Sequence, residues 1–167
     1  MALAAAGSGV RASEAELGRV EAMLDGALRH WVTLADGPDG GAGSTGITAF
    51  ERLFAVSLRG YPSGRGIADR SGDRLGVLVI GFAVARDGGA VGDARVRYHA
   101  EDFAGAYVTA PGTEGLVTLT RFDARAGTVV GLFEGRMCWR PDPIATPDPA
   151  RCRDIAGSFD TALPRSR

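Results

Sequence analysis

From Thr128 to Leu163 the sequence reads TVVGLFEGRMCWRPDPIATPDPARCRDIAGSFDTAL, in which two strand-like segments flank a span that holds four prolines. In the antiparallel register that places Cys138 opposite Cys152, Arg136 lies opposite Asp154, which makes an oppositely charged pair. On the other side of this hairpin each large residue meets a glycine, as interlocked core packing requires. These pairs are Phe133 with Gly157, Phe159 with Gly131, and Ile155 with Gly135.

The same register brings together the only two cysteines of the chain. We therefore predict a disulfide between Cys138 and Cys152, a bond that persists in oxidising compartments. A periplasmic or extracellular location, associated with the cell envelope, follows from such a bond. The alternative is a pair of reduced thiols, with Cys138 packing as a small hydrophobic residue.

The region ahead of this hairpin also predicts short β-segments. In one of them Val96 and Tyr98 alternate with arginines, which gives the strand one apolar and one wet face. About seven strands separated by glycine turns favour an antiparallel β-sandwich or small barrel, formed by residues 47–163. The expected strands ahead of the hairpin are residues 54–58, 75–84, 95–99, 106–110 and 116–123.

An amphipathic α-helix is predicted for residues 13–35. Ser13 and Glu16 have the spacing of a capping box, in which each side chain satisfies a backbone N–H at the helix start. Apolar residues then recur mostly three or four positions apart and form one stripe. We expect this stripe to dock on the β-domain of the same chain or on a partner protein, so it is a candidate interface. It comprises Leu17, Val20, Leu24, Leu28 and Trp31.

Three further segments flank the predicted elements. Residues 1–12 are expected to be a leader or the remnant of a signal segment, and residues 36–46 a Gly-rich linker. Residues 164–167 form a tail. No apolar run reaches the roughly 18 residues that a transmembrane helix needs, so no transmembrane segment is predicted.

A second candidate interface is an arginine-rich loop between two predicted strands. Arg65, Arg70 and Arg74 cluster there with Asp69 and Asp73, which is typical of solvated ion pairs. Arginine is also enriched at protein interfaces. Both interpretations, a solvated charge network and a protein-binding loop, stay open.

The composition excludes several kinds of chemistry. The chain of 167 residues has 19 basic side chains, all of them arginine, and it lacks lysine, asparagine and glutamine. A P-loop lysine, a Schiff-base lysine and an N-glycosylation site are therefore absent. The net charge of -1 gives no basic footprint for nucleic acid. Codon usage in GC-rich DNA accounts for the missing residue types and for the 25 glycines.

No set of residues predicts an active site, a cofactor site or a metal site. His30 and His99 are the only imidazoles, and no G-x-S-x-G nucleophile motif occurs. The G-x-G-x-x-G match at residues 41–46 follows a predicted helix and linker rather than a strand, which does not fit a dinucleotide site. His99, Glu101 and Asp102 are too few to hold zinc without distant ligands.

Parts of residues 75–163 resemble a family of uncharacterised bacterial envelope lipoproteins with small β-domains. The resemblance lies in GLVTLTRFD (residues 115–123), GTVVGLFEG (residues 127–135) and IAGSFD (residues 155–160). It implies an all-β, exported and non-enzymatic domain. No catalytic residue carries over from this family.

Together these observations favour a non-catalytic exported β-domain. Such a domain would bind another protein or act as an accessory structural subunit of a membrane-associated complex in the cell envelope. The alternative is a carrier of small apolar ligands, with a calycin-like barrel whose cavity is lined by Phe, Leu and Val. A hydrolase that uses His99 is the third hypothesis. A filled interior would argue against the carrier.

Overall fold

The computed structural model describes residues 16–35, 45–63, 75–88, 91–100, 105–113 and 115–164. Across these ranges the chain forms ten β-strands and no helix, so the prediction of a mainly β protein is confirmed. None of the described segments is a helix of the length and apolarity needed to cross a membrane. The strands are β1 (Glu16–Leu24), β2 (Ala27–Leu34), β3 (Gly46–Ala49), β4 (Leu53–Pro62), β5 (Leu78–Ala85), β6 (Val91–Tyr98), β7 (Ala106–Thr109), β8 (Leu116–Asp123), β9 (Thr128–Arg140) and β10 (Asp148–Ala162).

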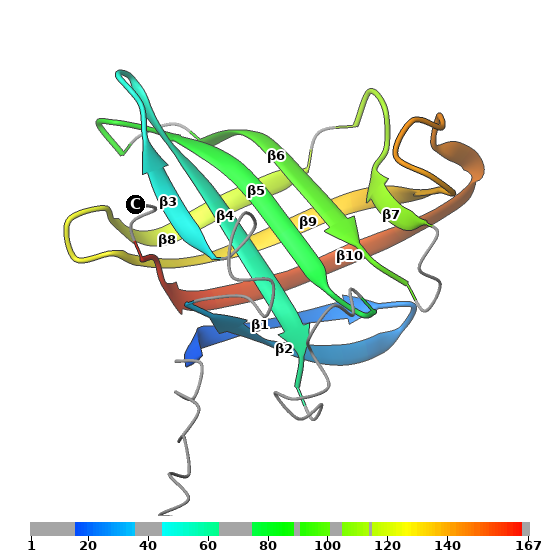
Figure 1. The fold of residues 1–167 in the computed structure, drawn as a ribbon, viewed down its shortest axis with the longest axis horizontal. Helices are drawn as coiled ribbons and strands as arrows, with labels where there is room; N and C mark the ends of the chain where they lie inside the picture. Colours follow the sequence, from blue (N-terminus) through cyan, green and yellow to red (C-terminus); the bar gives the residue numbers. More distant parts are fainter. Residues whose placement is uncertain are drawn as a thin grey trace, which may run out of the picture.

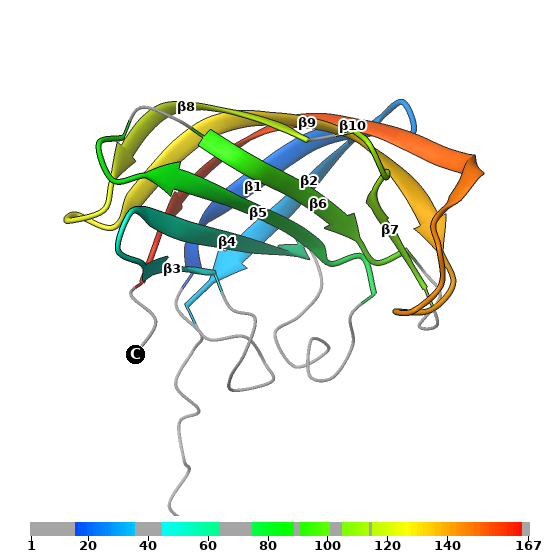
Figure 2. The ribbon, with the colours of Figure 1, turned by 90° about the horizontal axis from the view of Figure 1, so that it is seen from above.

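All ten strands belong to one antiparallel sheet, in the order β10-β1-β2-β4-β5-β6-β7-β9-β8, with β3 paired to β4. Strand β9 also pairs with β10, so the sheet curls and its two halves face each other across the core (Figure 1, Figure 2). It is not a regular closed barrel, because the strand pairing narrows to two residue pairs between β6 and β7. The expected sandwich or small barrel of about seven strands is thus a single curled sheet with more strands.

The hairpin of β9 and β10 has the predicted register. Cys138 pairs with Cys152, Arg136 with Asp154, and Gly131 with Phe159. The disulfide joins the two cysteines, and Arg136 lies 3.3 Å from the Asp154 carboxylate. A Cβ atom on Gly131 would lie 2.8 Å from the Phe159 ring, so this glycine makes room for the aromatic side chain. The alternation of large residues and glycines therefore identified a real packing interface.

The predicted helix over residues 13–35 is wrong. Residues 16–34 form the hairpin of β1 and β2, which turns at Asp25 and Gly26. Both turn residues have positive φ, 56° and 74°, as the two-residue turn that suits β-hairpins requires. Apolar residues alternate along each strand. When the two strands and the turn are read as one stretch, the apolar residues also recur three or four positions apart, as they do on one face of a helix. The Asp-Gly pair is the signal that distinguishes the hairpin.

The core lies inside the curled sheet. Phe82 of β5 stacks on Phe159 of β10 at a ring distance of 5.8 Å, and Phe133 of β9 lies 6.3 Å from Phe159. Trp31 of β2 contacts Tyr98 of β6 edge-on, at 6.4 Å. Aromatic pairs of this kind add to the free energy gained from burying their area. The two facing halves of the sheet are therefore held together by ring contacts.

Strand β6 has the predicted apolar and wet faces. Val96 and Tyr98 are buried in the core, whereas Arg95 and Arg97 are exposed on the outer surface. His99 lies just beyond the strand, where its backbone N–H donates to the Val77 carbonyl at 2.9 Å. The outer face of β6 thus presents two arginines to solvent.

The turn between β8 and β9 makes one pH-dependent contribution to stability. The Asp123 carboxylate accepts hydrogen bonds from the backbone N–H groups of Ala126 and Arg125, both at 2.8 Å. These bonds favour the charged form and lower the pKa of Asp123 below its ordinary value. The stabilisation is therefore present at neutral pH and is lost as the pH falls through the lowered pKa.

We expect Asp123→Ala to lower the urea midpoint at pH 7, with a smaller difference from the wild type below about pH 4. The matched control is Asp160→Ala, which removes an exposed aspartate from β10. A difference between Asp123→Ala and the wild type that stays constant from pH 7 to pH 2 would contradict this role.

Candidate functional site

One surface segment lies between the two cysteines, residues 139–151, and we call it the disulfide loop. It connects β9 to β10 at one end of the sheet, beside β7, which pairs with β9 up to Arg140 (Figure 1). The Cys138–Cys152 bond closes it at its base. The cysteines lie on the outer face of the sheet, because Met137 and Phe133 of β9 lie on the core side.

Hydrogen bonds and prolines hold the disulfide loop in one conformation. The Asp142 carboxylate accepts from the backbone N–H groups of Ile144 at 2.9 Å and Ala145 at 2.8 Å. Asp148 accepts from the Ala150 N–H at 2.9 Å. Four prolines fix the backbone φ angles of the loop and reduce the conformations open to it. They are Pro141, Pro143, Pro147 and Pro149.

Ile144 stands at the tip of this loop with 98% of its surface exposed. The next most exposed large apolar residue among those described is Leu28, at 57%. Ile144 follows directly after the Asp142 turn, so the backbone that carries it is fixed. The protein thus presents an isolated apolar side chain on a rigid support.

Aromatic and arginine side chains pack against one another at the base of the disulfide loop. The Trp139 ring lies 5.2 Å from the Tyr107 ring, and the Arg151 guanidinium lies 5.0 Å from the Trp139 ring centre. The Arg153 guanidinium lies over Tyr107 at 4.3 Å and pairs with the Asp25 carboxylate. Cation–π contacts of this kind stabilise modestly at exposed sites.

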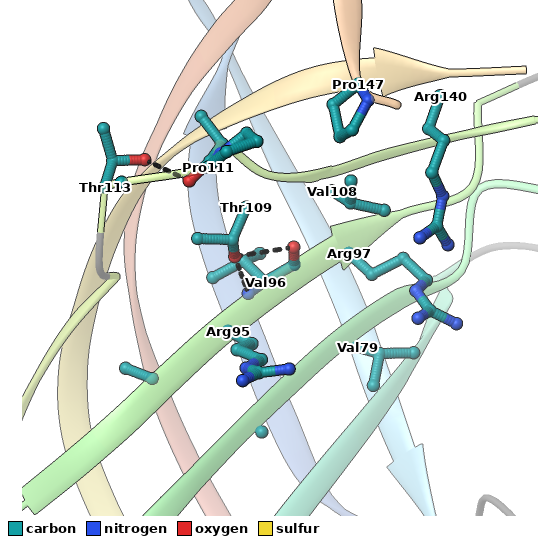
Figure 3. A pocket seen from close by; sticks show the side chains of 14 residues that line it. Val79, Arg95, Val96, Arg97, Val108, Thr109, Pro111, Thr113, Arg140 and Pro147 are labelled. Atoms are coloured by element: carbon teal, nitrogen blue, oxygen red, sulfur yellow. Dashed lines mark hydrogen bonds between the residues drawn. The ribbon is translucent and has the colours of Figure 1, made fainter. Parts of the chain in front are cut away.

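Beside the disulfide loop lies an open groove on the outer face of β5, β6 and β7, with a volume of about 530 Å³. It forms where β7 diverges from β6. There the Thr109 hydroxyl takes the place of a backbone partner for Val96 of β6. It accepts a hydrogen bond from the Val96 N–H at 2.7 Å and donates one to the Val96 carbonyl at 3.1 Å. We call this depression the arginine groove, because Arg95, Arg97 and Arg140 line it (Figure 3).

The arginine groove combines positive charge with an apolar lining. No carboxylate stands among the described residues that line it. Figure 3 shows the side chains of Arg97 and Arg140 reaching the same end of the groove. Guanidinium groups bind carboxylate and phosphate oxygens through paired hydrogen bonds. The apolar part of the lining includes Val79, Val108, Ala110, Pro111 and Pro147.

A second surface is an apolar row across the outer face of β2, β1, β10, β9 and β8. In register it runs Leu28, Met23, Ala156, Glu134 and Leu116. Its three large apolar members are 47% to 57% exposed. A shallow hollow of about 480 Å³ lies over the middle of the row. We call this surface the outer row.

No protein-family model, curated protein or solved structure matches this chain. The candidate site therefore stands on the geometry of these residues alone.

The predicted interface residues fall in different places. Val20, Leu24 and Trp31 are buried in the core and cannot offer a surface, whereas Leu28 is exposed in the outer row. Leu17 is half-buried at the start of β1. The predicted Gly-rich segment, the Arg65, Arg70 and Arg74 loop, and Glu101 with Asp102 lie outside the described residues, apart from Thr45 and Gly46.

Sequence reasoning missed the arginine groove and the exposure of Ile144. The prolines of the disulfide loop were evident, and a lone isoleucine between two Asp-Pro pairs is the signal that an apolar side chain is held in solvent. Arg140 joins Arg95 and Arg97 only because β7 separates β6 from β9 by a single strand. No local pattern reports that arrangement. Among the described residues no group of three His, Cys, Asp or Glu side chains is placed to hold a metal ion.

Proposed function

We propose that this protein is an exported, non-catalytic β-domain that binds another protein and acts as an accessory subunit of an envelope-associated complex. The observation that carries this proposal is Ile144, 98% exposed at the tip of a disulfide-closed loop. The partner would supply an apolar pocket that takes this side chain.

The rigidity of the disulfide loop favours recognition. A flexible segment loses conformational freedom on binding, and this loss subtracts from affinity. The Asp142 hydrogen bonds, the prolines and the disulfide remove that freedom before any partner arrives. Burial of an isoleucine side chain in a partner pocket contributes about 2 kcal/mol. The loop is thus organised to use one apolar anchor efficiently.

Aromatic contacts inside the sheet make a carrier the weaker proposal. A calycin-like carrier holds its ligand inside the sheet, where in this protein Phe82 and Phe133 both contact Phe159. We therefore place binding on the outside of the sheet. An exported location draws support from the disulfide, which suits an oxidising compartment, and from the resemblance of residues 75–163 to envelope lipoprotein domains.

Recovery of the partner by Ile144 variants tests this function. We expect Ile144→Asp to lower recovery of the partner from solubilised envelopes of the source cells at least about tenfold, because a charge cannot enter an apolar pocket. Ile144→Leu should retain most of it. The matched control is Leu132→Asp, an exposed leucine on β9 that lies outside the disulfide loop.

Each pattern of loss has a definite meaning. A protein recovered equally with the wild type and Ile144→Asp would overturn the role of the loop. Loss with Leu132→Asp alone would contradict the loop as well, and would place binding near the outer row. Because every substituted side chain is exposed, we expect all three variants to fold. Their urea midpoints check this expectation.

A further inference from the structure

We propose that the free edge of β8, the side of residues 117–122 that faces away from β9, binds an extended segment of a partner protein as one more antiparallel strand. The segment would carry apolar residues at alternate positions and a carboxylate opposite Arg121. Addition of a strand to a sheet edge is a recurrent mode of peptide recognition. The free edge and the disulfide loop lie at opposite ends of β9 (Figure 1), and the inference does not rest on the function proposed for Ile144.

The sheet ends at β8. Its path runs from β10 to β8, and the β10 end is closed by a second pairing with β9. Strand β3, which branches from β4, has the C-terminal segment on its other side, where the Ile47 N–H donates to the Pro164 carbonyl at 3.2 Å. In the part of the chain that the structure describes, β8 pairs with no strand except β9. Figure 1 shows β8 diverging from β6 along its length.

The backbone of β8 directs polar groups toward this open side. The Gly115 N–H, just before the strand, donates to the Ala94 carbonyl of β6 at 3.1 Å, so Gly115 points away from β9. Both polar groups of a residue in an extended strand point to one side, and the side alternates from residue to residue. Val117 and Leu119 therefore also point away from β9. The described part of β6 pairs with this segment only at the bridge between Ala94 and Gly115, so an added strand can bond to these groups.

The inner side of the free edge offers apolar contacts. Leu119 and Phe122 of β8 are half-buried, and so is Val91 at the start of β6. All three pack against the core while part of their surface stays accessible. The Phe122 ring also lies 5.7 Å from the Phe54 ring of β4. Alternate side chains of an added strand would point to this inner side and remove part of the accessible apolar surface from water.

The outer side of the free edge carries a positive charge. Arg121 is exposed, and no hydrogen bond or ion pair joins its guanidinium group to another residue in the described ranges. An opposite charge directly across from it on a neighbouring strand stabilises the pairing. The register of β8 against β9 shifts between Leu119 and Arg121, and such irregularities, like edge charges, limit the pairing of identical edges. The free edge therefore suits an acidic partner segment better than a second copy of this chain.

A titration of the isotope-labelled full chain with synthetic peptides, followed by NMR, tests the free edge. The probe is SVTVDVTVS with both ends blocked, which alternates valine with polar residues around a central aspartate. We expect contacts between Hα atoms of the peptide and of β8, and slower solvent exchange of the Val117 and Leu119 amide protons. The lysine peptide SVTVKVTVS should bind at least about threefold more weakly because it meets Arg121. SVTPDPTVS should not bind, since proline lacks the N–H that a ladder needs.

Variants assign the binding to the backbone and to the charge of β8. Leu119→Pro removes an N–H on the open side and should weaken the aspartate peptide at least about fivefold. Leu119→Ala keeps that N–H and should stay within about threefold of the wild type. Arg121→Glu should make the lysine peptide the tighter ligand, whereas the matched control Arg19→Glu, at an exposed arginine of β1, should keep the wild-type preference. If Leu119→Pro does not fold, the reversal at Arg121 tests the free edge by itself.

The outcomes separate the free edge from the disulfide loop. No binding of the aspartate peptide, or binding without contacts to β8, would overturn the proposal. Equal affinities of the aspartate and lysine peptides for the wild type would overturn the acidic partner. Dimerisation of the free chain through β8, detected by sedimentation, would show that a second copy occupies the edge and would overturn it as well. Ile144→Asp should bind the peptide as the wild type does, so failure of this titration would leave the Ile144 experiment intact, and the converse holds too.

Discussion

Replacing Cys138 and Cys152 together by alanine is expected to lower the free energy of unfolding by about 3 kcal/mol. The bond joins residues 14 positions apart, so the unfolded chain without it gains the freedom of an open loop. Folding must then close that loop at an entropic cost. Urea unfolding followed by tryptophan fluorescence measures the loss, since Trp139 lies next to Cys138.

The disulfide prediction has a control within the same loop. Ile144→Ala changes an exposed side chain and should leave the unfolding free energy within about 0.5 kcal/mol of the wild type. A loss below about 1 kcal/mol in the double cysteine variant would show that the rest of the loop already restrains the unfolded chain. That result would contradict the disulfide as the main clamp.

The second large effect is expected at Gly157 of β10. A Cβ atom there would lie 2.1 Å from the Glu21 carbonyl oxygen and 2.5 Å from the Ala22 Cβ of β1. The first contact involves the backbone, so relief requires β1 and β10 to move apart along their shared ladder. We expect Gly157→Ala to lower the free energy of unfolding by about 3 kcal/mol or more.

Two further variants test whether the close approach of β1 is the cause. Gly92→Ala in β6 adds the same methyl group where no atom lies within 4 Å, and it should cost under about 1 kcal/mol. Adding Ala22→Gly to Gly157→Ala removes one of the three close contacts, the one with the Ala22 Cβ, and should restore part of the lost stability. Equal losses for Gly157→Ala and Gly92→Ala, measured by urea unfolding, would contradict the packing argument.

Gly157 also shows where the sequence was informative and where it was not. The hairpin of β9 and β10 could be predicted because pairing, charge and size complementarity all favour the same register, which the structure has. Gly157 pairs with Phe133 as predicted. Its tightest contacts, however, are with β1, a strand for which the sequence pattern indicated a helix. When a glycine is required because a strand distant in the sequence packs against it, the residues around that glycine show no pattern that predicts the contact.

The hairpin of β1 and β2 could have been recognised from Asp25 and Gly26. The apolar spacing from Val20 to Trp31 satisfied a helical period because alternation on two strands, joined by a two-residue turn, also repeats at three and four. Turn chemistry therefore outweighs periodicity when an Asp-Gly pair divides an apolar stripe.

The parts of the candidate site differ in how far they could be predicted from the sequence, because they depend on tertiary arrangement to different degrees. The disulfide loop is local, so its closure and its prolines could be predicted from residues 138–152. The exposure of Ile144 depends on the Asp142 turn, which an Asp-Pro pair suggests but does not orient. The arginine groove unites β6 and β9 across β7, and strand order over that distance is not encoded locally.

Site-specific photo-cross-linking in living source cells tests the proposed role of Ile144 most directly. A photoreactive amino acid is placed at position 144, at position 132 on β9 as a matched exposed control, and at position 28 in the outer row. We predict that one protein adduct forms at position 144 and that it is absent at positions 132 and 28. No adduct at position 144, or the same adduct at all three positions, would contradict a partner that recognises the disulfide loop.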